Sequence, residues 1–314
     1  MNKLNWINVS KGIGILSVVA GHTYEGEITR NIFIFHMPLF FFISGYLLKP
    51  TKDYDYFFNK KSKHLLVPYV FFLAILYPSF YGLPHLNIKE IAEYFYVPIM
   101  GGSMLNGALG VFWFVSCLFL TQQLMNYLIF NFHAKTMFVI VLIFFIVSFF
   151  NTYNKNIWLP WNSHVLLAAS PIYYIGYYSR QVTLKVNKIY IFILGFLILI
   201  FSGMFPNNVY DMKFTNYGYP FITLFSSLIL ILNIKHFSLY ISKYKHIEKC
   251  FSELGRASMI IMYLHLPFLL ILKNYKIENN HIQFIVSIFS SYLCYLLFIK
   301  SKYTRLLILG KSTN

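Results

Sequence analysis

Three histidines inside apolar stretches are the side chains of this sequence best suited to chemistry: His22, His36 and His265. Imidazole titrates near neutral pH and can serve as a general base, and an ionisable group at membrane depth is by default a functional-site candidate. Lys11 lies eleven residues before His22, which on a helix returns to nearly the same face roughly 16 Å further along. We therefore predict a helix with a cation near one end and a base near the other. A lone intramembrane histidine is also a common hydrogen-bond partner between helices, and that alternative stays open for His36 and His265.

The composition identifies an integral membrane protein. Hydrophobic residues make up 58% of the 314 residues and charged residues only 11%, with a mean hydropathy of +0.59, whereas soluble domains average about 25% charged. A window of about 20 residues per span predicts ten helices: Ile7–Tyr24, Asn31–Leu48, Leu65–Leu83, Leu109–Phe130, Thr136–Phe150, His164–Ser179, Ile189–Phe205, Tyr217–Ile234, Ala257–Leu272 and Ile282–Ile299. We predict an all-α polytopic membrane protein, with about ten transmembrane helices in a single bundle that forms one domain over residues 1–314. A further amphipathic or re-entrant piece is expected at Ile88–Met100, and Gly12, Gly14 and Gly21 suit close helix packing.

The basic residues set the expected orientation. A formal net charge of +16 could indicate nucleic acid, but in so apolar a chain the lysines are better explained by the positive-inside rule, and we expect no nucleic-acid partner. With a cytoplasmic N-terminus, most lysines and arginines fall in inside segments, among them Lys60, Lys61 and Lys63 (the lysine triplet) in a predicted cytoplasmic loop, Lys49–His64. The asymmetry favours an even number of spans and places both termini in the cytoplasm.

Other classes of function find less support in the sequence. The three cysteines, Cys117, Cys250 and Cys294, offer neither a disulfide framework nor paired metal-ligand spacing, so no metal site is expected. A polytopic transporter or exporter of a polysaccharide or lipid-linked intermediate remains the alternative, with the histidines lining a pathway. The expected spans lack paired acidic residues for a proton relay and show no inverted repeat of broken helices, so an enzyme is favoured.

Several motifs resemble the membrane acyltransferase 3 family, and within it the fucose 4-O-acetylase type of sugar O-acetyltransferase. The likeness rests first on Trp6–Ile13 and Val18–His22, followed by His36–Leu47. Weaker matches follow along essentially the whole chain: Lys60–Lys63 leading into Leu66–Tyr69, Phe112–Phe114, Leu254–Ser258 and Tyr263–Pro267.

The resemblance implies a ten-helix enzyme of the bacterial inner membrane. Such an enzyme takes an acyl group, usually acetyl, from cytoplasmic acyl-CoA and transfers it to a hydroxyl of a cell-surface glycan or its lipid-linked precursor. Acetyl-CoA would be a donor cosubstrate, with no tightly bound cofactor. His22 matches the family's essential histidine, and the lysine triplet matches the basic loop associated with the donor. Lys11 stands where many members have arginine, and so lacks the bidentate fork, and Asn8 stands where relatives commonly have aspartate.

These observations assign expected roles. His22 is the predicted general base, with Lys11 and His36 as further catalytic residues. Donors for the oxyanion of the tetrahedral intermediate could come from His36, Ser44 or Tyr46, which are not ranked. The lysine triplet is expected to bind the phosphates of coenzyme A. Expected substrate-binding residues are Ser44, Tyr46, Trp113 and His265. Membrane lipid and a second copy of the chain are further candidate partners, and both direct transfer and an acyl-enzyme stay open.

Overall fold

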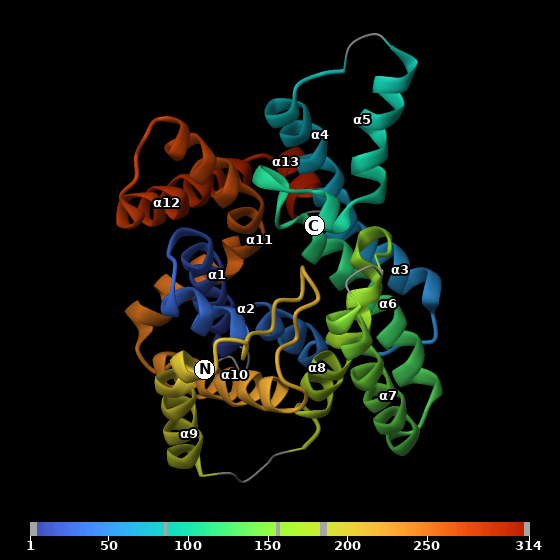
Figure 1. Cartoon of the computed structure of the whole chain (residues 1–314), viewed down its shortest axis with the longest axis vertical. Coiled ribbons are helices and arrows are strands. Elements are labelled where there is room, and N and C mark those ends of the chain that lie inside the picture. Colours follow the sequence, from blue (N-terminus) through green and yellow to red (C-terminus); the bar gives the residue numbers. More distant parts are fainter. Residues whose placement is uncertain (1–4, 85–86, 155–157, 183–186, 311–314) are drawn as a thin grey trace. The chain divides into compact units, whose positions relative to one another are not determined.

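The computed structural model describes residues 5–84, 87–154, 158–182 and 187–310. Within these ranges the chain is helical, and the one isolated β-bridge joins Asp211 and Asn216 (Figure 1). Seven helical segments of the described chain are long and apolar enough to cross a membrane. The expected all-α polytopic membrane fold is therefore confirmed.

Each of the ten expected spans has a helical counterpart. These helices are α1 (Asn5–Thr23), α2 (Glu27–Tyr46), α4 (Val67–Tyr81), α6 (Phe112–Asn131), α7 (Ala134–Tyr153), α8 (Leu166–Tyr178), α9 (Lys188–Phe201), α10 (Ile222–Ile241), α11 (Lys245–Asn274) and α12 (Asn280–Phe298). The piece expected at Ile88–Met100 is helix α5, and α13 covers Lys302–Leu309. Length and hydropathy together single out seven spans, which leave out α8 with 13 residues, α9 with 14 and also α1 with 19. A bundle of ten crossings stays a prediction.

The lysine triplet lies on a helix, which corrects the expected loop Lys49–His64. Helix α3 (Tyr54–Lys61) begins where the Asp53 carboxylate accepts a hydrogen bond of 2.9 Å from the Tyr56 amide, as an N-cap residue does. A single π-helical turn, η1 (Ser62–Leu66), then joins α3 to α4, so that helix runs from Tyr54 to Tyr81. A hydropathy window finds only the apolar half of this helix, because charged and polar residues are interspersed among the aromatic ones in its first two turns.

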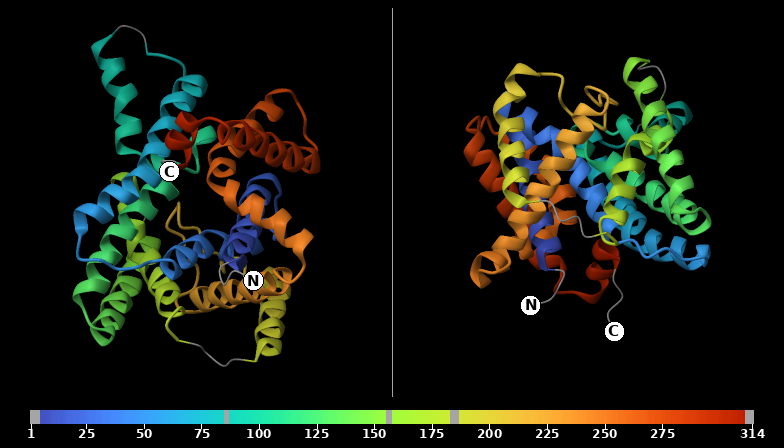
Figure 2. Two further views of the ribbon diagram at one scale, coloured as in Figure 1. Left: turned by 180° about the vertical axis from the view of Figure 1, so that it is seen from behind. Right: turned by 90° about the horizontal axis from the view of Figure 1, so that it is seen from below.

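The chain divides into two compact units. The first comprises Met1–Lys49, Phe132–Asn156 and Leu167–Ser258, and its centre is a mutual packing of α1, α2 and α10 (Figure 2). A hydrogen bond of 2.8 Å from the Ser10 hydroxyl to that of Ser238 ties α1 to α10. The Lys235 ammonium of α10 lies 5.4 Å from the ring centroids of both Trp6 and Tyr46, so one cation–π cluster holds all three helices together.

Two helix crossings in the first unit depend on glycine. At the α2–α8 crossing, a Cβ on Gly45 would collide with the Tyr173 carbonyl, and a Cβ on Gly176 would collide with the Phe42 carbonyl. The α1–α11 crossing uses Gly12 and Gly255 in the same reciprocal way, with collisions against the carbonyls of Phe251 and Asn8. Backbones that approach this closely are typical of membrane helices with small residues at their interfaces.

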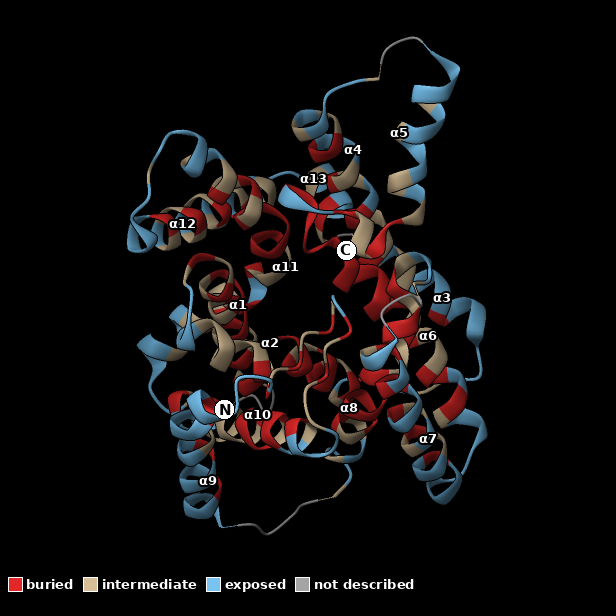
Figure 3. Ribbon diagram, viewed as in Figure 1, coloured by how far each residue is buried: buried red, intermediate tan, exposed pale blue. Residues whose placement is uncertain are grey.

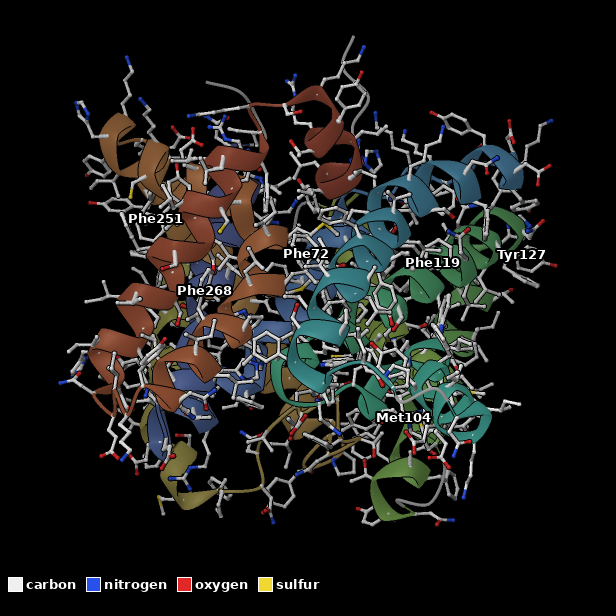
Figure 4. All side chains as sticks on the ribbon, turned by 90° about the horizontal axis from the view of Figure 1, so that it is seen from above. Phe72, Met104, Phe119, Tyr127, Phe251 and Phe268 are labelled. Carbon is white, nitrogen blue, oxygen red and sulfur yellow. The ribbon has the colours of Figure 1, made fainter. Side chains whose placement is uncertain are left out.

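The second unit comprises Pro50–Asn131, Ile157–Leu166 and Met259–Asn314, and α6 is its most deeply buried helix (Figure 3). Helix α3 lies along α6 through two aromatic pairs, Phe58–Phe119 at 5.6 Å and Tyr54–Tyr127 at 5.8 Å between ring centroids (Figure 4). Asn126 of α6 also exchanges two 3.0 Å hydrogen bonds with the backbone of Thr51. These contacts fix the helix that carries the lysine triplet.

Candidate active site

His36 is held by its own helix in a form that suits a base. Its side chain is buried, with 4% of its surface exposed, and its ring centroid lies 4.7 Å from that of Phe33. The Nδ1 atom lies 2.9 Å from the Ile32 carbonyl oxygen. Because a carbonyl only accepts, the neutral ring carries its proton on Nδ1 and leaves Nε2 as an acceptor. His36 therefore presents a lone pair rather than an N–H at Nε2.

His22 lies in the last turn of α1 and is half-buried. The residue before it, Gly21, faces α2, because a Cβ there would lie 3.2 Å from Ile32 Cγ2 and 3.3 Å from Phe33 Cε2. These two α2 residues form the turn that precedes and hydrogen-bonds His36. The turns that carry the two histidines are thus neighbours, as the α1–α2 hairpin was expected to place them.

A loop that sequence reasoning missed covers this end of the first unit. The segment 206–221 joins α9 to α10 and folds inward, so that Tyr210, Met212 and Tyr217 are at most 1% exposed (Figure 2). The Tyr210 amide donates to the Phe33 carbonyl at 3.1 Å, and its hydroxyl donates to the Ala168 carbonyl at 3.1 Å. The 206–221 loop therefore binds both α2 and α8 beside the histidine turn.

The 206–221 loop also carries two partly buried charged side chains, Asp211 and Lys213. Burial raises the pKa of Asp211, against the opposing effect of the Phe214 and Lys213 amides and the Lys213 charge. Burial also lowers the pKa of Lys213 to about 8, although the neighbouring Asp211 carboxylate acts in the opposite direction. An amine with a pKa near 8 is partly deprotonated under mildly alkaline conditions. The signal in the sequence was a tyrosine-rich, charged segment between two strongly apolar helices.

Ser44 and Tyr46 belong to the opposite end of α2. Tyr46 packs against Trp6 at 5.0 Å between ring centroids, and Ser44 interacts with the Tyr173 hydroxyl of α8. Eight and ten residues separate them from His36, which corresponds to roughly 12 and 15 Å along the helix. They cannot share one oxyanion with His36. Lys11, half-buried on α1, also lies towards this end, roughly 16 Å along the axis from His22.

The remaining predicted residues belong to the second unit. His265 and Trp113 are buried in α11 and α6, and His265 Nδ1 lies 2.9 Å from the Ile261 carbonyl oxygen, the arrangement also found at His36. In the lysine triplet, Lys60 and Lys63 are exposed and Lys61 is half-buried. The Lys60 ammonium donates to the Tyr56 hydroxyl at 3.2 Å. The described residues contain no group of three or more His, Cys, Asp or Glu that could hold a metal ion.

Comparison with known proteins gives one match, to a family. A search of curated proteins finds no relative, and a search of solved structures finds no similar chain. The family model described as an acyltransferase domain, that of the acyltransferase 3 family, matches residues 4–300. That range includes α1 to α12 and with them every predicted site residue. Because the match covers nearly the whole chain, the protein belongs to the membrane acyltransferase 3 family and is an acyltransferase.

Proposed function

We propose that this acyltransferase moves an acyl group, in the simplest case acetyl, from acyl-CoA to a hydroxyl of a bacterial cell-surface glycan or its lipid-linked precursor. The observation that carries the proposal is the pairing of His22 and His36 on neighbouring turns of α1 and α2. Transfer to an alcohol needs a base within hydrogen-bond reach of the hydroxyl. The family assignment indicates the class of reaction, and His22 of this pair is the proposed base.

The two histidines take different parts in the proposed reaction. His22 accepts the proton as the acceptor's hydroxyl oxygen attacks the thioester carbonyl. The tetrahedral intermediate then collapses, the carbon–sulfur bond breaks, and the imidazolium returns its proton to the leaving thiolate. Because neutral His36 has its Nδ1–H directed to the Ile32 carbonyl, its Nε2 can accept a hydrogen bond but cannot stabilise an oxyanion. We assign His36 to orienting an acceptor hydroxyl.

The cationic residues suit the donor. Coenzyme A carries several phosphate charges, and positive side chains raise the local concentration of such a ligand. Lys11 and Lys235 supply cations at the end of the first unit away from the histidines, and the lysine triplet supplies them in the second. The proposed setting is the bacterial inner membrane with both termini in the cytoplasm, where these lysines meet acetyl-CoA.

The central experiment replaces His22 by glutamine, which can form hydrogen bonds but cannot take up a proton at neutral pH. Loss of a general base costs a factor of about 10² to 10⁴ in rate, and we expect that loss in His22→Gln and His22→Ala. The matched control is His133→Gln, because His133 is exposed at the start of α7. The readout is acceptor-dependent consumption of acetyl-CoA by purified protein without an ion gradient, which a transporter would not show.

Two outcomes bear on the assignment. Near-normal transfer by His22→Gln protein that elutes as a single folded species would remove His22 from the chemistry. Lys11→Arg should be tolerated and Lys11→Ala should not, because the proposal needs a cation at that position.

A further inference from the structure

An apolar groove opens on the first unit between α9 and α10. It has a cavity volume of about 540 Å³, within the range of about 300 to 1,000 Å³ usual for small-molecule sites. Its walls are Leu194, Leu197 and Phe201 of α9, and Phe221, Ile222 and Phe225 at the start of α10. These side chains are between 41% and 62% exposed. In a membrane helix such a surface meets hydrocarbon, so a lipid chain is the occupant that its chemistry suits.

One end of the groove is polar and includes an unsatisfied acceptor. Asn208, which is 8% exposed, lines the groove together with Ser202 and Ser226. Its Nδ2 donates to the Ser226 hydroxyl at 3.3 Å, but its buried Oδ1 has no hydrogen-bond partner in the described part of the chain. A buried polar atom without a partner is destabilising. This oxygen lacks a donor, which a hydroxyl of a bound molecule would supply once the side chain turns into the groove, and which a bare hydrocarbon chain does not carry.

The polar end of the groove adjoins the loop that binds the histidine turn of α2. Asn208 precedes Tyr210 by two residues, so their Cα atoms are at most about 7 Å apart. The Tyr210 amide donates to the Phe33 carbonyl, in the turn of α2 that adjoins His22 and His36. A second contact supports this, because η5 (Ser202–Met204) packs against α2, with Gly203 beside the Glu27 carboxylate. A lipid whose chain fills the groove would place its polar head beside the 206–221 loop.

We infer that the groove binds the hydrocarbon chain of a lipid-linked glycan acceptor, and that Asn208 Oδ1 accepts a hydrogen bond from a hydroxyl of its head group. This inference rests on the proposed function and narrows its acceptor to the lipid-linked form. Bulk phospholipid fits the walls of the groove equally well, and its ammonium or glycerol head group also carries donors, so the labelling experiment has to distinguish the two.

The experiment measures binding by photolabelling in nanodiscs of phosphatidylethanolamine and phosphatidylglycerol, without acyl-CoA. The probe is a polyisoprenyl glucoside with a diazirine in its chain, and the comparison probes are the corresponding methyl ether and a diazirine phosphatidylethanolamine. Leu197→Trp fills the groove. Leu199→Trp is its matched control, because both leucines lie on α9 with 41% and 38% exposure but only Leu197 lines the groove. Ile222→Trp is a second groove variant should Leu197→Trp fail to fold.

We expect Leu197→Trp to lower glucoside labelling of residues 194–226 about tenfold, equivalent to about 1.4 kcal/mol, and Leu199→Trp to leave it unchanged. Asn208→Leu should lower labelling by the glucoside but not by the methyl ether. Equal labelling of the two tryptophan variants, or equal labelling by phosphatidylethanolamine and glucoside, would overturn the inference. Failure of the proposed function would be seen separately, as donor consumption that does not depend on His22 while glucoside labelling is unchanged.

Discussion

The α2–α8 crossing gives the sharpest test of how the helices of the first unit pack. In Gly45→Ala, the new methyl group would overlap the Tyr173 carbonyl oxygen, and in Gly176→Ala the overlap is with the Phe42 carbonyl oxygen. Backbone atoms cannot rotate away as a side chain can. The two helices must therefore separate by roughly 1 Å or more to restore ordinary contact.

The expected cost follows from that separation. A crossing brings together tens of atom pairs worth about 0.1–0.2 kcal/mol each, and a gap of 0.5–1 Å forfeits a quarter to a half of that attraction. The loss is on the order of 2–3 kcal/mol, which lowers the unfolding midpoint by roughly 5–10 °C at about 2–4 °C per kcal/mol. The control is Gly14→Ala, whose methyl group would lie 3.0 Å from Phe40 Cζ and 3.1 Å from Leu39 Cδ2. Those are mobile ends of side chains, so the control should cost much less.

The assay is thermal unfolding of purified protein in one detergent, followed by thiol-reactive fluorescence and size-exclusion chromatography. Since either alanine alone forces the separation, Gly45→Ala and Gly176→Ala together should destabilise little more than one of them. Gly45→Ala and Gly12→Ala act at different crossings and should add. The close approach of these backbones would be refuted if Gly45→Ala and Gly176→Ala had additive effects on stability. It would also be refuted if Gly14→Ala destabilised the protein as much as Gly45→Ala.

Three further predictions concern orientation and charge. In a variant without the native cysteines, an impermeant thiol reagent on intact cells should label a cysteine at Asn207 but not one at Lys52, and the reverse would invert the topology. Glutamine at all three positions of the lysine triplet should raise the KM for acetyl-CoA while insertion is unchanged, whereas a role in orientation alone leaves KM unaltered. Competitive amine labelling across pH should give Lys213 an apparent pKa of about 8, in contrast to about 10.4 for an ordinary lysine. An ordinary value would show that burial of the ammonium is slight, and Asp211→Asn should lower the value further because it removes the opposing carboxylate.

The apolar spans were predictable because a membrane helix makes all its backbone hydrogen bonds within itself and is recognisable by its length and hydropathy. The span expected at Tyr217–Ile234 was displaced, because α10 begins at Ile222 and ends at Ile241. The other expected spans agree with the helices to within a few residues except where polar residues continue a helix, as at Tyr54 and Lys245. There, capping and i,i+4 contacts rather than hydropathy sustain the helix, and an apolar window does not register them.

The candidate site was predictable only in part. Spacing along one chain indicated that His22 and His36 would occupy one end of a hairpin, because the two helices are adjacent in sequence. Spacing could not indicate that the Tyr210 amide donates a hydrogen bond to the carbonyl of Phe33, which lies 177 residues earlier in the chain. That contact depends on how a distant loop folds. Gly12 was expected at a close approach, but its partner Gly255 lies far along the chain and becomes visible only when α1 and α11 cross.

The π-helical turn Ser62–Leu66 contains one additional residue, and that residue determines the direction in which the lysine triplet faces. Its widened ring closes with the Val67 amide on the Ser62 carbonyl, five residues apart, and so accommodates one more residue than an α-helical turn. Removing that residue would convert the turn to α-helix and rotate α3 by about 100° relative to α4. A one-codon deletion could therefore redirect the charges of this helix while every lysine, and the net charge, stayed the same.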